Sequence, residues 1–289
     1  MCGSFAFRGL FSASTSPTSA KRAPSGLPWL LLLLVAVLHP ALAATVAGST
    51  PGTFKVSETG AATYTIPITV PPGAAGMTPN LALVYNSQGG NGVLGMGWSL
   101  SGLSAITRCP ATYAQDGFKG GINYDANDRF CLDGQRLVAV SGAYGANGAE
   151  YRTETESYTR VISYGTAGNG PAWFKAWTKA GQIIEYGNTE DARIEAQEKP
   201  TARMWGANKI SDTKGNYIAV SYTEDNANGE AYVSRVDYTG NDGAGVAPFA
   251  SVQFFYETRT DIDSGYEAGS LSRNSNRIKT ISTYNGTAV

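Results

Sequence analysis

The stretch from Pro71 to Pro110 reads PPGAAGMTPNLALVYNSQGGNGVLGMGWSLSGLSAITRCP, and it decides the fold class. A turn rich in proline and glycine leads into Asn80–Asn86, where side chains alternate as in a β-strand. The loop Gln88–Gly92 is typical of a hairpin, and a second strand is predicted over Ser99–Thr107. The glycines around the methionine and tryptophan predict positive φ angles or close backbone contacts, because glycine lacks a Cβ atom. The stretch therefore indicates a tightly packed β-corner, not a catalytic loop.

The rest of the chain repeats this pattern of short strands and tight turns. Glycine accounts for 35 of 289 residues, above the average of about 7%. No segment after Ala44 has a convincing helical period of about 3.6 residues. We therefore predict an all-β fold of many short antiparallel strands and hairpins. Further strands are predicted at Phe54–Thr59, Ala61–Val70, Arg129–Leu132, Gln135–Val140, Glu150–Thr155, Thr159–Tyr164, Ala172–Trp177, Gln182–Tyr186, Met204–Ser211, Tyr217–Tyr222, Val233–Tyr238, Val252–Glu257 and Arg277–Tyr284.

Pro67 and the pair Asp133-Gly134 predict particular backbone features in or between these strands. Pro67 has no backbone N–H, so it belongs at a sheet edge or a bulge. Asp133-Gly134 separates two apolar runs and is a strong signal for a two-residue hairpin turn.

Residues 1–43 have the features of an export signal. A basic lead precedes the apolar run Leu27–Leu38, and Ala41–Ala43 supplies a small-x-small cleavage site. The run is shorter than the roughly 20 residues that span a bilayer, and an uncleaved anchor reaching Val46 is the alternative. We predict a signal peptide at 1–43, a linker at 44–51 and a secreted chain with no membrane span after signal removal.

The charge balance argues against a nucleic-acid partner. The formal net charge is −1, and residues 1–43 hold three basic residues and no acidic ones. The remainder has 19 basic and 23 acidic residues. Such a slightly acidic body lacks the basic surface that phosphate binding requires.

The predicted mature chain lacks the usual catalytic and cofactor motifs. The only histidine of the sequence, His39, lies in the predicted signal, so the mature chain has no Ser-His-Asp or Cys-His system and no histidine zinc site. It has no Walker lysine loop and no strand-to-helix GxGxxG. One group resembles calcium ligands but lacks the mid-loop Gly and terminal Glu of an EF-hand, so turn hydrogen bonding is the favoured role. Its members are Asp125, Asn127, Asp128 and Asp133. We predict no catalytic, cofactor-binding or metal-binding residue.

Two cysteines remain after signal removal, Cys109 and Cys131, with 21 residues between them. In an exported protein, two cysteines on neighbouring strands favour a disulfide. Two buried free thiols are the alternative.

Three segments carry a family resemblance: GAATYTIPITVPPG (60–73), the run from 77 to 110, and NYDANDRFCLDGQRLV (123–138). They resemble the N-terminal region of the SpvB family, which is shared with the B component of Tc insecticidal toxin complexes and with secreted Rhs/YD-repeat proteins. The resemblance is largely ungapped from about residue 52 to 137 and weaker as far as 284.

The resemblance implies a structural role without enzymatic activity. In that family, the region forms part of a β-sheet casing that encloses or delivers a separate toxic domain. Partners would be the remainder of the Rhs/Tc-type casing or other toxin-complex components. Secretion is expected, although some family members are also cytoplasmic. Family members continue far beyond this length, so we expect the β domain at 52–289 to be truncated in its C-terminal part.

The expected truncation also affects the last strands. Val252–Tyr256 is apolar and β-prone, and Ile278–Tyr284 would pair with strands that are absent here. We expect the chain to be folded over about 52–223 and frayed or self-associating beyond, because open strand edges promote association.

Two rival interpretations remain open. Glu154-Thr155-Glu156 resembles the acidic pair of arginine-directed ADP-ribosyltransferases, but an exposed strand with alternating Thr and Glu is favoured. The second is a secreted carbohydrate- or surface-binding β-sandwich, in which tryptophans stack on sugar rings. Its candidates are Trp98, Trp173, Trp177 and Trp205; Trp173 and Trp177 share a face if they lie in one strand. Core packing is the favoured use of these aromatic residues.

Overall fold

The computed structural model describes residues 50–286, and most of their regular structure is antiparallel β-sheet. The first sheet has the strand order β1-β2-β3-β6. The predicted edge or bulge position of Pro67 is wrong, because β2 lies between β1 and β3 and Pro67 pairs with Ala82 of β3. Pro67 is tolerated as the last residue of β2, where β1 no longer extends beside it, since the last pair with β1 is Thr53 with Thr65. The strands of this region are β1 (Thr53–Val56), β2 (Ala62–Pro67), β3 (Ala82–Asn86), β4 (Asn91–Gly92), β5 (Gly95–Met96) and β6 (Trp98–Ser101).

The deciding stretch forms β3 as predicted, but the second predicted strand, Ser99–Thr107, is wrong as a single element. It is divided between β6 and β7 (Ala105–Cys109), which belong to different sheets. The break falls at Gly102, whose φ is +97°, and a Cβ atom there would lie 1.9 Å from the carbonyl oxygen of Asn80. Only glycine permits this approach, so the chain leaves the first sheet at this residue.

Strands β7 to β13 and β15 form a closed ring, because β13 pairs with both β12 and β15. The ring surrounds a core in which Phe130, Phe174 and Trp205 meet edge to face, with ring centroids 5.1 to 5.4 Å apart. Its strands after β7 are β8 (Arg129–Leu132), β9 (Gln135–Ser141), β10 (Glu150–Thr153), β11 (Arg160–Tyr164), β12 (Trp173–Trp177), β13 (Ile183–Tyr186) and β15 (Ala202–Ser211).

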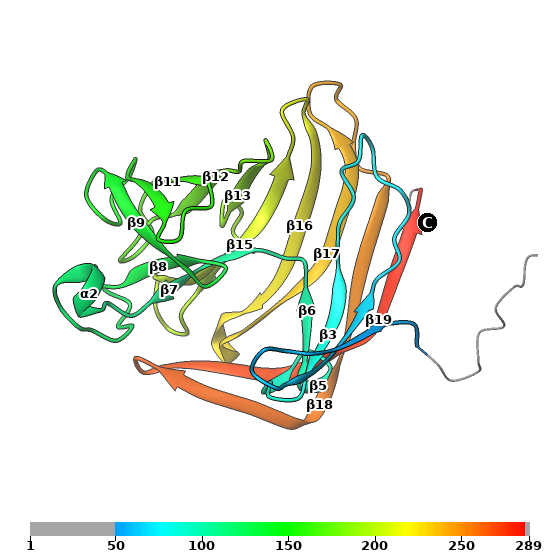
Figure 1. Cartoon of the computed structure of the whole chain (residues 1–289), viewed down its shortest axis with the longest axis horizontal. Coiled ribbons are helices and arrows are strands. Elements are labelled where there is room, and N and C mark those ends of the chain that lie inside the picture. The colour runs from blue at the N-terminus through cyan, green and yellow to red at the C-terminus, as the bar shows by residue number, and fades with distance from the viewer. Residues whose placement is uncertain (1–49, 287–289) are drawn as a thin grey trace, which may run out of the picture. The chain divides into compact units, whose positions relative to one another are not determined.

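Strand β15 leads from the ring into a sheet of long strands (Figure 1). These are β16 (Asn216–Asp225), β17 (Glu230–Asn241), β18 (Ala250–Glu267) and β19 (Ser270–Asn285). A second core forms where Met77 and Leu81, beside the first sheet, pack with apolar residues of the long strands such as Val236 and Phe254. The long hairpins therefore gain burial from a distant part of the sequence.

The predicted Asp133-Gly134 hairpin turn is confirmed. Asp133 and Gly134 have φ angles of +48° and +81°, the two positive values that a type I′ turn requires. Five small elements were not predicted: the strands β4, β5 and β14 (Arg193–Glu195), the helix α2 (Tyr113–Asp116) and the 3₁₀ turn η1 (Asn226–Asn228). Each is only two to four residues long, too short to show a hydrophobic period.

The expectation that Ile278–Tyr284 lacks a partner strand is wrong. This segment belongs to β19 and pairs with Ser251–Tyr256 of β18, for example Ile281 with Phe254. The chain supplies its own partner by turning at Ala268-Gly269, where both φ angles are positive. The N–H of Ile278 also donates to Val93 O at 2.7 Å, so one point on the outer edge of β19 is covered.

The predicted signal at 1–43 and most of the predicted linker lie outside the described residues. Within residues 50–286, none of the helices has the length and hydrophobicity needed to cross a bilayer.

Candidate functional site

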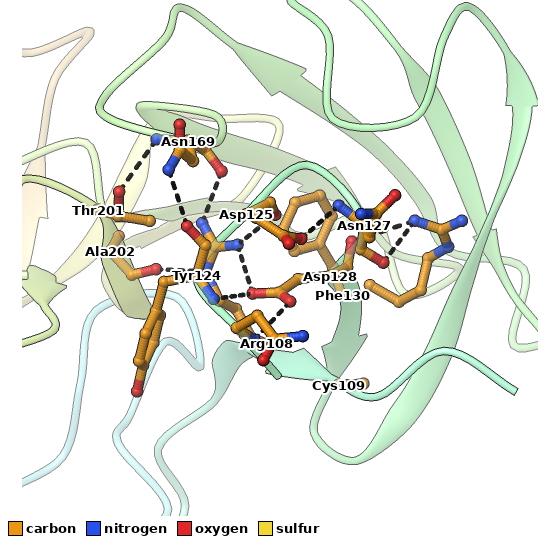
Figure 2. Close-up of polar contacts among 12 residues, drawn as sticks. Arg108, Cys109, Tyr124, Asp125, Asn127, Asp128, Phe130, Asn169, Thr201 and Ala202 are labelled. Atoms are coloured by element: carbon orange, nitrogen blue, oxygen red, sulfur yellow. Dashed lines mark hydrogen bonds and ion pairs between the residues drawn. The ribbon is translucent and has the colours of Figure 1, made fainter. Parts of the chain in front are cut away.

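A buried ion pair joins the ring to the loop that precedes β8. Arg108 lies on β7, and Asp128 ends the loop that precedes β8. Arg108 Nη1 donates to Asp128 Oδ2 at 2.9 Å, and the two side chains are 1% and 0% exposed (Figure 2). Such a pair is expensive to desolvate, so it persists only where additional hydrogen bonds satisfy both groups.

The Asp128 carboxylate also holds the preceding loop in place. Its Oδ1 accepts from the N–H of Asn123 and its Oδ2 from the N–H of Tyr124, both at 2.8 Å. Tyr124 has a φ of +57°, which is uncommon for a residue with a side chain. The carboxylate therefore fixes a turn that the backbone alone would not favour.

The guanidinium of Arg108 joins four separate segments. Its Nε donates to Ala202 O at 2.6 Å, Nη2 to Asn169 O at 2.9 Å and Nη1 to Asp125 O at 3.3 Å (Figure 2). Its central carbon lies 5.6 Å from the ring of Trp205. A cavity of about 190 Å³ lies beside this pair, between the Asp125–Asp128 turn and the Asn169 loop. The arrangement fastens loops to the ring core and presents no nucleophile.

The acidic residues considered from sequence accept hydrogen bonds from the backbone, but only some of them within their own turn, because Asp128 also pairs with Arg108 and Asp133 bonds a distant segment. Asp125 Oδ1 accepts from the N–H of Asn127 at 2.7 Å, an Asx-turn. Asp133 accepts from the N–H of Ala105 at 2.9 Å. Within residues 50–286, no group of three or more His, Cys, Asp or Glu side chains has a metal-binding arrangement.

A second ion-pair cluster lies on the short helix α2. Asp116 accepts from Arg129 Nε at 2.7 Å and from Arg136 Nη2, and also from the N–H of Thr112 at 2.9 Å. Burial raises the pKa of Asp116, but these hydrogen bonds outweigh burial and hold the pKa below its ordinary value. The cluster attaches α2 to β8 and β9.

The two cysteines lie between these ion-pair clusters. Cys109 ends β7 and Cys131 lies on β8, the strand paired with it. The structure joins them as a disulfide with Cα atoms 6.0 Å apart, within the usual range for a disulfide. Both residues are buried. The bridge remains a prediction for the exported protein.

The four tryptophans have different surroundings and do not form one platform. Trp205 is fully buried and donates from Nε1 to Pro171 O at 3.1 Å, while Trp98 packs against Tyr85. Trp173 and Trp177 do share the outer face of β12, because Phe174 and Ala176 between them point into the core. Core packing is thus confirmed for Trp205, and the paired outer tryptophans were correctly placed on one face.

The Glu154-Thr155-Glu156 segment is not part of a strand, contrary to the expectation. β10 ends at Thr153, and the segment lies exposed in the loop before β11. Glu154 accepts from Gln115 Nε2 at 2.8 Å, and Glu156 accepts from the N–H of Tyr158 within its own turn. The strand ends early because Thr153 Oγ1 bonds the Ser157 hydroxyl and closes the loop.

Sequence reasoning missed the role of Arg108. Its alternation with Ile106 on β7 could have revealed it, because both side chains point inward. A charged residue at an inward position signals a buried partner. The partner, Asp128, is 20 residues away, a separation that no local pattern encodes.

The fold and this site define an all-β protein whose loops are held by buried ion pairs. The chain belongs to the SpvB family: residues 56–243 match the family described as Salmonella virulence plasmid 65kDa B protein. The chain is 27% identical over 204 residues to the mono(ADP-ribosyl)transferase SpvB of Salmonella typhimurium and to that of Salmonella dublin. These alignments cover 63% of this chain and 32% of each relative, so the chain spans about a third of their length.

Solved structures share the fold. The crystal structure of TcdB2-TccC3 superposes with a TM-score of 0.65 at 20% identity, over 82% of this chain and 14% of that one. The Photorhabdus luminescens Tc holotoxin pore gives 0.64 at 19% identity, with the same coverage of 82% and 14%. The N-terminal domain of effector SpvB from Salmonella typhimurium LT2 gives 0.59 at 21% identity, over 76% of this chain and 88% of that domain.

Proposed function

We propose that this chain is a structural segment of a secreted toxin or virulence protein, in which it forms part of a β-shell that encloses or delivers a separate toxic domain. One observation carries the proposal: the same fold occurs in the N-terminal domain of SpvB and within TcdB2-TccC3. The buried ion pairs of Arg108 and Asp116 are compatible with a structural shell, because they hold loops in place and present no reactive group. Its partners are the remainder of the casing or other toxin-complex components.

The proposal includes secretion and the absence of intrinsic catalysis. Secretion rests on the predicted signal at 1–43 and on the position of Cys109 beside Cys131. The transferase activity in the name of the Salmonella relatives belongs to those proteins, of which this chain matches 32%. Incubation with labelled NAD and host extract should transfer no label. Transfer that disappears in a Glu156→Ala variant would overturn this part.

Isolation of the native assembly tests the central claim. The chain is tagged at its own locus, recovered from culture medium and treated with protease. We expect it to co-purify, or be continuous, with a YD-repeat polypeptide and a second domain that resists protease until mild denaturant opens the assembly. A chain that is recovered alone, or whose associated domain is digested at once, contradicts the shell role.

A carbohydrate-binding function is the second candidate, and the outer face of β12 favours it. Trp173 stacks on Tyr164 with ring centroids 4.3 Å apart, and Arg160 lies 5.3 Å from the ring of Trp177. Half-exposed aromatic residues beside charged side chains can stack on sugars. A glycan array with the purified chain and a Trp173→Ala, Trp177→Ala variant separates the candidates, because the shell role predicts no specific glycan signal.

A further inference from the structure

The end of the β18–β19 hairpin folds back toward the ring. Regular pairing stops at Thr258 with Asn276 and resumes at Asp263 with Asn274, so β18 contains a large bulge. Arg259 fills the bend, where its side chain is 0% exposed and donates to Gly92 O at 2.9 Å. In Figure 1, the orange and red end of this hairpin runs from the long sheet toward the strands of the ring.

Residues from three other parts of the chain, two loops and the start of β15, bond this hairpin end. The Tyr124 hydroxyl donates to Glu267 Oε2 at 2.8 Å, and the N–H of Leu271 donates to Gln197 Oε1 at 3.1 Å. Arg203, on β15, donates to the Ser272 hydroxyl at 2.8 Å. These contacts leave a concave, polar space between the hairpin end and the starts of β15 and β17.

That space is a cavity of about 290 Å³. Its lining includes Arg203, Asp263, Ser264, Arg273 and Asn274. A neighbouring cavity of about 290 Å³ shares Arg203 with it and also contacts Tyr124 and Glu267. The pair of cavities is therefore large enough for a small polar molecule or for one or two side chains of another molecule.

This cavity is distinguished by the two arginines of the described region that form no ion pair. Residues 50–286 contain eleven arginines, of which nine form ion pairs with a carboxylate. The two that form none, Arg203 and Arg273, both line the same cavity. In the described region, the Arg203 side chain bonds only Ser272 Oγ and Gly229 O, and that of Arg273 has no hydrogen-bond partner.

The acidic side chains nearby do not satisfy these arginines. Asp263 lines the cavity without forming an ion pair with either arginine, and Glu267, in the adjoining cavity, accepts from the Tyr124 hydroxyl. Half-buried guanidinium groups favour a bidentate anionic partner, since their planar N–H forks match the oxygens of carboxylate and phosphate.

We propose that the cavity between Arg203 and Arg273 is an oxyanion-binding site that takes a carboxylate or phosphate group. Arg273 supplies the free guanidinium, and Arg203 is already oriented by Ser272 and Gly229. Ser264 and Asn274 in the lining offer additional neutral donors. The ligand reaches the site from solvent at the open side of the hairpin.

Calorimetric titration of the full chain tests this site. Citrate and inorganic phosphate serve as probes at low ionic strength, and sodium chloride at matched ionic strength serves as the reference. We expect saturable binding of at least one oxyanion, weakened at least tenfold by Arg273→Gln. Arg277→Gln is the matched control, because Arg277 lies on the same strand but pairs with Glu257 outside the cavity.

The pattern of responses decides the proposal. Binding of citrate alone identifies carboxylates as the ligand class, and binding of phosphate alone identifies phosphates. No saturable binding, an equal response to chloride, or equal binding by the parent and the Arg273→Gln variant overturns the site. Thermal unfolding of both variants verifies folding, and a Ser264→Ala variant provides a second test if Arg273→Gln is unfolded.

Discussion

Replacing Asp128 by asparagine should be among the most destabilising single changes in the ring. The substitution keeps the size of the side chain but removes its charge. Arg108, with a side chain 1% exposed, then holds a buried charge without a counterion. The new amide group also points an N–H₂ toward donors, because the carboxylate oxygens now accept from Arg108 and from two backbone N–H groups.

The expected magnitude follows from this burial. Removing one partner of a buried ion pair costs about 3–5 kcal/mol in the free energy of unfolding. The lower part of that range applies here, since the guanidinium keeps its hydrogen bonds to Ala202 O and Asn169 O. With an m-value of about 3 kcal/mol/M, the urea midpoint should fall by about 1 M.

Equilibrium urea unfolding followed by tryptophan fluorescence measures this change, because Trp205 lies against Arg108. Asp125→Asn is the matched control in the same loop: its Oδ1 accepts only from the N–H of Asn127, which an asparagine can still satisfy. The control should lose less than about 1 kcal/mol. If Asp128→Asn and the control lose equally little, the ion pair does not hold the loop, and the reasoning fails.

Three further predictions concern the disulfide, pH and export. Replacing both Cys109 and Cys131 by serine should lower the free energy of unfolding by about 3 kcal/mol, and non-reducing peptide mapping of exported protein should recover the two segments joined; full alkylation without reduction would contradict the bridge. Asp116→Asn should be less stable than the parent at neutral pH, and the difference should shrink below about pH 4, because a depressed pKa contributes stability above the unfolded value that is lost as pH falls through the folded one; a pH-independent difference in urea midpoints would refute this. N-terminal sequencing of exported protein should begin at Ala44, whereas residues 1–43 retained in a membrane fraction would indicate an anchor.

Local patterns in the sequence were sufficient where turn chemistry and alternation agreed. Asp133-Gly134 predicted both its turn and the strands on either side, because aspartate and glycine tolerate positive φ. Gly102 lies inside the predicted strand Ser99–Thr107, and the pattern did not reveal that the chain changes sheets there. That change depends on Asn80, whose carbonyl occupies the space beside Gly102.

The longest hairpin was missed because its turn has unusual chemistry. Ala268 has a φ of +46° and Gly269 a φ of +79°, although alanine rarely adopts positive φ. The sequence Ala-Gly is a weaker turn signal than Asn-Gly or Asp-Gly, so β18 and β19 were predicted as short, separate strands. Tertiary contacts of the hairpin end, such as the hydrogen bond from Tyr124 to Glu267, stabilise this turn where the local sequence does not.

Closure of the ring could not be predicted from the sequence either. β13 and β15 pair between Ile183 and Ser211, across a segment that contains the short strand β14. Short strands look alike in hydrophobic pattern, and only three-dimensional packing around Trp205 selects the partner. The candidate site could not be predicted for the same reason: Arg108 and Asp128 lie on separate segments, and only the folded chain brings them together.

Buried arginines offer one physical explanation for how this loop-rich chain specifies its fold. Arg108 connects the loop before β8 with Asn169 and Ala202, and Arg259 connects the bend of β18 with Gly92 of β4. Arg108 satisfies three backbone carbonyl oxygens, and Arg259 satisfies one carbonyl and the Asn91 side-chain oxygen. Such partners are needed where irregular backbone is buried. Within the described residues, the Thr112 hydroxyl is the one buried side-chain polar atom without a hydrogen-bond partner. The arginines with internal acceptors therefore act as structural connectors, and Arg203 and Arg273, which lack carboxylate partners, are the pair left available to an external ligand.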